Sequence, residues 1–235
     1  MYHLVEKLCK KTWPTCLLVV YPLWFMWPTL LPGTGSMMQY SHILDTSGTV
    51  SIVQALDRMQ FPWSVNVMAN APIGESFWGL SRMVQSIQWL VLWSLTRFCS
   101  PILAVNLFIF IGWVLTGVSI FVLSRYLKLS MISATICGVL VQMLPWVREK
   151  AMTHVAYVYL CVPIFAILLL FKVQSNPNRV NFSKLFIYLS LTAFFDLYWF
   201  YINVIITFIF ILFSARNPEN FFIEFNSSSI INLWF

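Results

Sequence analysis

A carboxylate, Asp45, lies in the polar segment that follows the first apolar stretch, in the sequence His42-Ile-Leu-Asp45-Thr-Ser-Gly48. Apolar residues at helical spacing predict a short helix over 47–59, and Asp45 or Ser47 would be a suitable cap for it. The other interpretation is catalytic. A carboxylate in a partly dry cleft has its pKa raised toward neutrality, which suits a general base that takes a proton from a hydroxyl group.

The densest polar cluster combines Arg148-Glu149-Lys150 with His154. One interpretation is a surface loop whose charges pair with each other and with lipid headgroups. The other is an anion site, in which Arg148 or Lys150 holds a phosphate and His154 bonds it or shuttles a proton. We expect His154 to open a helix, and the positive end of the helix dipole would then also favour an anion.

A third candidate lies between two apolar runs, in the sequence Phe194-Phe-Asp196-Leu-Tyr198-Trp199. Asp196 is either a turn residue beside an aromatic belt at a membrane interface or a polar contact to a sugar, on which Tyr198 or Trp199 would stack. Gln142 lies inside an apolar run and is interpreted as a hydrogen-bonding link between helices. The acidic residues do not have the spacing of metal ligands, so the sequence identifies no cofactor. It leaves open whether the protein requires a divalent metal ion.

The segments that position these residues are strongly apolar. The chain has 235 residues, of which 60% are hydrophobic and only 9% are charged. A soluble domain would carry more charge, so the composition indicates a membrane protein. The net charge of +6 does not call for nucleic acid as a partner, because the excess cations lie in a few loops, as they do in membrane proteins.

The fold class expected is all-α and polytopic. Apolar runs predict six transmembrane helices, the first of them uncleaved, over 12–31, 101–123, 130–146, 156–171, 185–195 and 199–213. A seventh segment, 83–98, carries two glutamines and an arginine, and we predict an interfacial helix in a long outer loop. We expect a partial transmembrane domain over 1–214 and a tail over 215–235 that is the end of a truncated product.

The distribution of cations orients this topology. Nine of the 14 lysines and arginines fall in segments assigned to the inner side: Lys7, Lys10, Lys11, Arg125, Lys128, Lys172, Arg179, Lys184 and Arg216. The remaining five fall outside: Arg58, Arg82, Arg97, Arg148 and Lys150. The bias predicts a multi-pass protein of the cell membrane with a cytoplasmic N-terminus and the clusters above on the outer face.

Over residues 10–213 the order of these features resembles the N-terminal part of GT-C class integral-membrane glycosyltransferases, particularly prokaryotic members. The matching segments are Leu44-Asp45-Thr-Ser-Gly48, Asn70-Ala-Pro72-Ile-Gly74-Glu75, Ser100-Pro-Ile-Leu-Ala-Val-Asn106, Leu123-Ser-Arg125-Tyr-Leu-Lys128, Ser133-Ala-Thr-Ile-Cys-Gly138 and Thr153-His154 before a span that contains Pro163. Members of the class are longer, with more spans and often a soluble C-terminal domain. This chain also lacks an Asp-Asp or Glu-x-Asp pair.

The resemblance implies transfer of a sugar from a polyprenyl-phosphate-type donor to an acceptor at the outer membrane face. It implies that Asp45 is the base and that Glu75 and Glu149 are the acids of the first and second outer loops. The implied partners are the lipid bilayer and the lipid-linked donor. Two alternatives are an inactive N-terminal fragment and a transporter or flippase component, but the charges lie in loops and no repeat is present, which disfavours a transporter.

Overall fold

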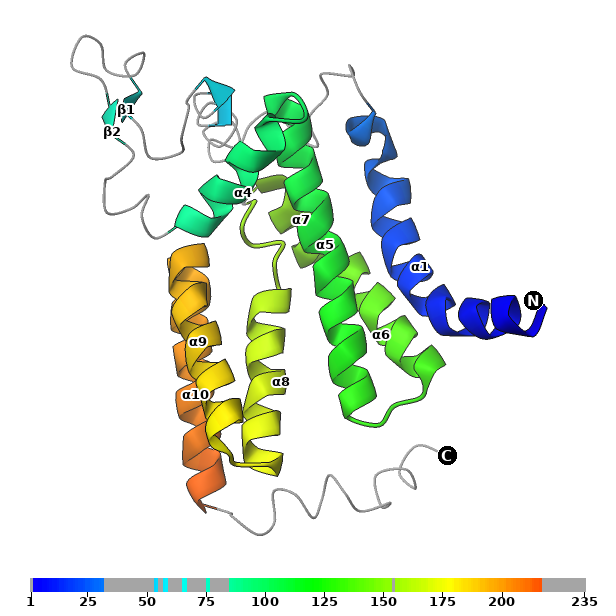
Figure 1. Ribbon diagram of the computed structural model, residues 1–235, viewed down its shortest axis with the longest axis vertical. Helices are drawn as coiled ribbons and strands as arrows, with labels where there is room; N and C mark the ends of the chain where they lie inside the picture. Colours follow the sequence, from blue (N-terminus) through cyan, green and yellow to red (C-terminus); the bar gives the residue numbers. More distant parts are fainter. Residues whose placement is uncertain are drawn as a thin grey trace.

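The structure is a computed structural model that describes residues 2–31, 53–54, 57–58, 65–66, 75–76, 85–153 and 155–216 (Figure 1). For some of these it describes the backbone alone: 2–12, 15, 65–66, 75–76, 150–153 and 215–216. The described residues form eight α-helices and one antiparallel pair of two-residue strands, so the expected helical fold class is confirmed.

Six helices run along the long axis of the molecule in two groups (Figure 1). The first group is α1 (Tyr2–Leu30), α5 (Pro101–Tyr126) and α6 (Met131–Met143). The second is α8 (Cys161–Ser175), α9 (Arg179–Phe195) and α10 (Leu197–Arg216), and α5 packs against α8 to join them. Two further helices, α4 (Ser86–Thr96) and α7 (Pro145–Thr153), lie at one end with the strands β1 (Val65–Asn66) and β2 (Glu75–Ser76).

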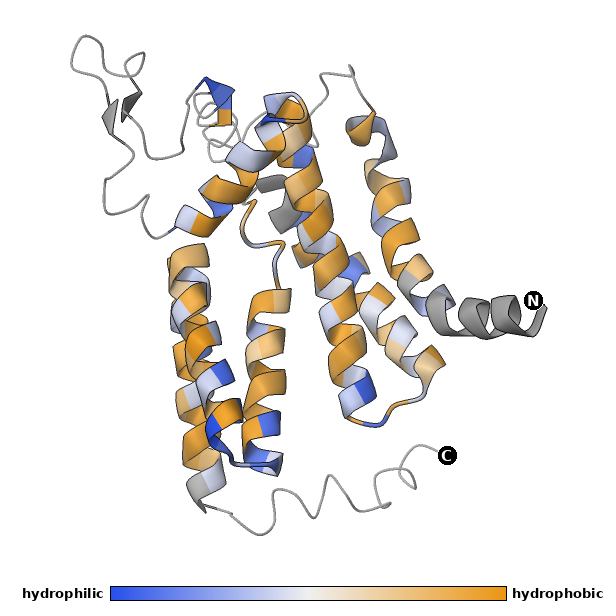
Figure 2. Cartoon of the chain, viewed as in Figure 1, coloured by the Kyte–Doolittle hydropathy of each residue, from blue (hydrophilic) through white to orange (hydrophobic). Residues whose placement is uncertain are grey.

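Residues with short polar side chains cap the N-termini of three helices. The Ser100 side chain accepts a hydrogen bond from the Leu103 amide at the start of α5, and Pro101 occupies the first helical position, where it has no amide to leave unpaired. Ser130 caps α6 and Asn178 caps α9 in the same way. Beyond these caps the helices are apolar along most of their length, and Figure 2 shows hydrophilic residues gathered toward their ends.

Gln142 joins three helices at the centre of the first group, as the sequence predicted. Its Nε2 donates to the carbonyl of Leu18 on α1 at 2.8 Å and to that of Trp113 on α5 at 3.1 Å. The Trp113 indole donates back to the Gln142 carbonyl at 2.9 Å. Glycines make room for this contact, because a Cβ on Gly138 would lie 2.8 Å from the Gly117 carbonyl oxygen. Helices α5 and α6 therefore cross with their backbones in direct contact.

Three expected boundaries were wrong. Residues 147–153, predicted as a loop, belong to helix α7. Helix α8 begins at Cys161, so 155–160 are turns and His154, itself outside the described residues, does not open α8. Helix α9 begins at Arg179 rather than 185, which places Lys184 on a helix.

The irregular segment 155–160 is accommodated because side chains bond its carbonyls. The Thr116 hydroxyl donates to the carbonyl of Val158 at 2.7 Å, and the Trp199 indole donates to that of Ala156 at 3.0 Å. Pro163 explains why the helix starts where it does, since proline fits the first turn but not the interior. Non-helical backbone inside an apolar bundle is tolerated only when its polar groups are satisfied in this way.

Among the described residues, two helices are long and apolar enough to cross a membrane, Pro101–Tyr126 and Leu197–Ser214. Three shorter helices are also apolar, Cys16–Leu30, Met131–Met143 and Cys161–Ser175. Large apolar side chains cover the outside of the second group, for example Phe186 on α9 and Phe208 on α10, which are 72% and 61% exposed. So much exposed apolar surface suits contact with lipid better than contact with water.

Candidate functional site

The two ends of the bundle differ in charge. We call the end that holds α4, α7 and the side chains of Asp57, Glu149 and Asp196 the carboxylate end. The opposite end, where α5 and α8 finish and α9 begins, is the cation end, which holds Arg125, Lys128, Lys172, Arg179 and Lys184. Every candidate site residue whose side chain the structure describes lies at the carboxylate end.

Asp196 sits in the turn between α9 and α10 and is only 2% exposed. Its Oδ1 accepts a hydrogen bond from the Tyr198 amide at 2.9 Å, which caps α10. Its Oδ2 accepts bonds from Nε2 of Gln85 and of Gln88, both at 3.3 Å. Gln88 also donates to the Phe195 carbonyl at 2.7 Å, so the two glutamines fasten α4 across this turn.

This geometry matches the turn interpretation of Asp196. A carboxylate that is buried and bonded to three donors cannot touch a sugar unless α4 moves away. The sequence indicated Gln85 and Gln88 only as polar residues of an interfacial helix and did not predict that they bond to Asp196. Their spacing of three residues, which places both on one helix face, was the available signal.

Two tyrosines stand at the surface beside the buried carboxylate. The Tyr198 ring is 66% exposed and lies edge-on to Tyr157, with the ring centroids 5.5 Å apart. Trp199 packs beneath them, 6.0 Å from Tyr157, but it is only 3% exposed. Of the two aromatics predicted to stack on a ligand, Tyr198 is therefore accessible and Trp199 is not.

Helix α7 carries the predicted anion-binding residues. Arg148 and Glu149 are both exposed, and the Arg148 guanidinium lies over the Phe25 ring of α1, 4.4 Å from its centroid. This cation–π contact orients Arg148 without neutralising its charge. Lys150 lies on the same helix with only its backbone described. His154 is outside the described residues, and the helix-dipole argument for it fails because α8 starts at Cys161.

The structure does not describe the side chains of Asp45 and Glu75, the two acids predicted as site residues in the first outer segment. Asp45 lies outside the described residues, and Glu75 is described as backbone in β2, paired with Asn66 of β1. Of the helix predicted over 47–59, the structure describes only Val53 and Gln54, which are helical, and the pair Asp57 and Arg58.

An ion pair ties this segment to α4. Arg97 lies 3.7 Å from the Asp57 carboxylate and also donates to the Asp57 carbonyl at 2.7 Å. The sequence did not predict the pair, since the two residues are far apart along the chain and only the fold brings them together.

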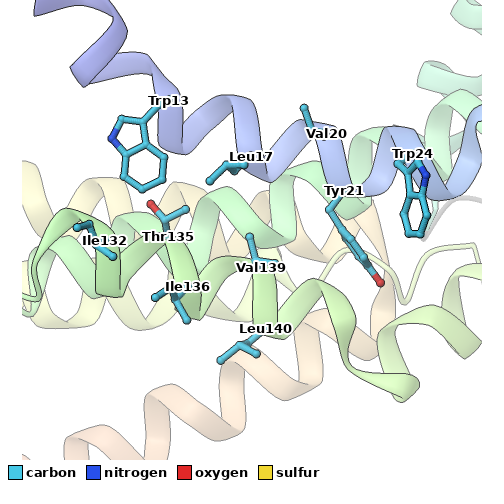
Figure 3. Close-up of a pocket in the computed structure, with 10 residues that line it drawn as sticks. All are labelled: Trp13, Leu17, Val20, Tyr21, Trp24, Ile132, Thr135, Ile136, Val139 and Leu140. Carbon is cyan, nitrogen blue, oxygen red and sulfur yellow. The ribbon is translucent and has the colours of Figure 1, made fainter.

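An apolar groove of about 510 Å³ runs between α1 and α6 (Figure 3). Its walls include Trp13, Leu17 and Trp24 on α1 and Ile136 and Leu140 on α6. Trp24 is next to Phe25, the residue over which Arg148 lies. The groove therefore extends from Trp13, beside the start of α6, to Trp24, one residue before the ring that Arg148 contacts.

No protein family, curated protein or solved structure matches this chain.

The arrangement can bind an amphipathic anion at the carboxylate end, with charge at Arg148 and an apolar chain in the groove. Among the described side chains, Glu149 and Asp57 are the carboxylates accessible to a ligand. No three His, Cys, Asp or Glu residues of the described part gather closely enough to hold a metal ion.

Proposed function

We propose that this chain is a multi-pass membrane protein that transfers a sugar from a polyprenyl-phosphate-type donor to an acceptor at the outer membrane face. In this proposal α1, α5, α6, α8, α9 and α10 cross the membrane, the cation end is cytoplasmic and the carboxylate end faces outward. The observation that carries it is the segregation of charge: five cations lie at one end, and no carboxylate side chain that the structure describes lies with them.

The donor would bind by its two chemically different parts. Its phosphate would lie at Arg148 and Lys150, because guanidinium and ammonium groups are the usual phosphate ligands. Its isoprenoid chain would lie in the groove between α1 and α6, whose walls are almost entirely apolar. The sugar would then be held beside Tyr198, whose exposed ring can pack on the apolar face of a pyranose and is supported edge-on by the half-buried Tyr157.

The reaction would be a single displacement with inversion. The acceptor hydroxyl oxygen attacks the anomeric carbon while the bond from that carbon to the phosphate oxygen breaks. The hydroxyl proton goes to Asp45, and the polyprenyl phosphate leaves with the bonding electron pair. Arg148 offsets the negative charge that develops on the leaving phosphate, a term that is usually the largest in such reactions.

The alternative of a transporter or flippase predicts a different charge pattern. Transporters hold ionisable groups near the midplane of the membrane, often on broken helices. In the described parts of the six helices proposed to cross the membrane, the charged side chains are Arg125, Lys172, Arg179 and Lys184, all toward the cation end, and the buried amides Gln142 and Asn203 are neutral. The charge pattern therefore favours a site at the membrane surface.

The proposal is tested in proteoliposomes supplied with undecaprenyl phosphate that carries radiolabelled glucose, mannose or galactose, together with membrane lipid extract as a source of acceptors. We expect Asp45→Asn to lower transfer of the label by at least about a hundredfold, the usual contribution of a general base. The matched control is Asp57→Asn, which removes a carboxylate from the same outer segment and should retain transfer. Equal turnover by wild-type protein and Asp45→Asn would remove Asp45 from the mechanism.

A further inference from the structure

A second groove, of about 410 Å³, lies among α8, α9 and α10 at the cation end, far from the site described above. Its walls are mainly apolar and include Leu170 and Val173 of α8, Phe182 of α9, and Phe210 and Ile211 of α10. The groove is therefore shaped for a hydrocarbon chain that lies along the bundle.

The groove is polar where the helices reach their ends. Gln174 and Ser214 line it, and the Gln174 Oε1 and Ser214 Oγ atoms are buried without a hydrogen-bond partner. Buried polar atoms without partners are costly, so they indicate a missing ligand or water molecule. A hydroxyl group that can donate to an ester or phosphate oxygen and an amide oxygen that can accept from a headgroup hydroxyl suit the glycerol region of a lipid.

Three cations lie at the same end of the bundle as this polar mouth, although none of them lines the groove. Arg179, the first residue of α9, is three residues before the lining residue Phe182 and therefore shares its helix face, whereas Lys172 and Lys184 lie on other faces of α8 and α9. All three side chains are exposed. The only carboxylate in 155–216 is Asp196, which lies at the other end of α9. Among the described side chains of 155–216, those that carry charge at this end are therefore all positive.

We propose that this groove is a binding site for an anionic phospholipid of the inner leaflet. One acyl chain would lie against Leu170, Phe210 and Ile211, and the phosphate would lie at the mouth, within reach of Arg179 on the same face of α9 as the lining residue Phe182. The charge complementarity of the mouth selects an anionic headgroup, and the apolar walls select a lipid over free phosphate. The lining of the groove between α1 and α6 has no comparable polar end. The proposed function assigns that groove to the isoprenoid chain of the sugar donor.

The test is titration of the purified full-length protein with phosphatidylglycerol and with phosphatidylcholine, with bound lipid counted by native mass spectrometry. We expect the wild-type protein to retain phosphatidylglycerol selectively. Arg179→Gln should weaken that binding by about fivefold, the effect of one cation near an anionic headgroup, and should leave phosphatidylcholine binding unchanged. The matched control is Lys128→Gln, which removes a cation from the same end but from the α5–α6 turn.

A second pair of variants tests the apolar part. Ile211→Trp fills the groove from an exposed position on α10, whereas Ile209→Trp places the same side chain on that helix outside the groove lining. We expect only Ile211→Trp to abolish the selective retention of phosphatidylglycerol. Both variants should keep the melting temperature of the wild-type protein. Equal retention of the two lipids by wild-type protein, equal losses in Arg179→Gln and Lys128→Gln, or full retention by Ile211→Trp would each overturn the proposal. Asp45→Asn should retain phosphatidylglycerol normally, so this result does not depend on sugar transfer.

Discussion

At the scale of single residues, the roles of Asp196 and Gln142 depend on partners in space. The sequence predicted that Gln142 links helices, because an amide in an apolar run must find a partner. It left Asp196 between a turn and a ligand contact, because the deciding donors, Gln85 and Gln88, lie more than a hundred positions earlier, with separations of 111 and 108 residues. Asp45 remains a prediction, since it lies outside the described residues.

The structural role of Asp196 gives a stability prediction. Asp196→Ala removes the cap of α10 and the carboxylate that accepts from the half-buried Gln85 and the buried Gln88, which keeps only its bond to the Phe195 carbonyl. We expect a loss of about 1–3 kcal/mol in the free energy of unfolding and a fall in the melting temperature of the order of 5 °C in detergent micelles.

Asp196→Asn is the matched control for this substitution. It keeps an oxygen that can accept from the Tyr198 amide, so its melting temperature should lie between those of the alanine variant and the wild-type protein. An alanine variant as stable as the wild-type protein would show that the α4 contact does not hold the α9–α10 turn.

At the scale of the elements, the apolar runs predicted where the helices lie but not where they end. Helix α7 was predicted as a loop because of its charges, yet Arg, Glu, Lys, Ala and Met are all good helix formers. Charge thus indicates exposure, and it does not by itself end a helix. Conversely, 155–160 are apolar enough for a helix, but Pro163 makes α8 start at Cys161 and side chains from two other helices, α5 and α10, bond the segment.

The contact between α5 and α6 gives a prediction about helix packing. A Cβ on Gly117 would overlap the Gln142 amide, so Gly117→Ala should destabilise the protein by about 1–3 kcal/mol despite the higher helix propensity of alanine. In a Gln142→Ala background the overlap is gone, and the additional cost of Gly117→Ala should largely disappear. The measurement is a double-mutant cycle of melting temperature or of resistance to unfolding by SDS.

Gly138→Ala is the matched comparison. Its Cβ would meet the Gly117 carbonyl oxygen, a backbone atom that cannot rotate away, so its cost should persist in the Gln142→Ala background. If both alanine variants were rescued equally by Gln142→Ala, the direct contact of the two backbones would be refuted.

At the scale of the whole molecule, the proposal depends on how the bundle sits in a membrane. The charge count along the sequence predicted cations on one side, and the fold gathers the five cations of the cation end together. The number of crossings was harder to predict, because α6 has 13 residues and reaches only about 20 Å, less than the thickness of a hydrocarbon core. In the proposed topology, short helices such as α6 and α8 cross the bilayer together with longer neighbours and with irregular segments whose backbone groups are bonded. A short window of sequence does not reveal these neighbours.

The most direct test measures which end of the bundle faces outward. Glu149→Cys and Arg179→Cys, each in a variant whose five native cysteines are replaced, place one exposed thiol at the carboxylate end and one at the cation end. In intact cells, a membrane-impermeant maleimide should label the thiol at 149 and should label the thiol at 179 only after permeabilisation. Labelling at 179 in intact cells, or at 149 only after permeabilisation, would contradict the outer-face site.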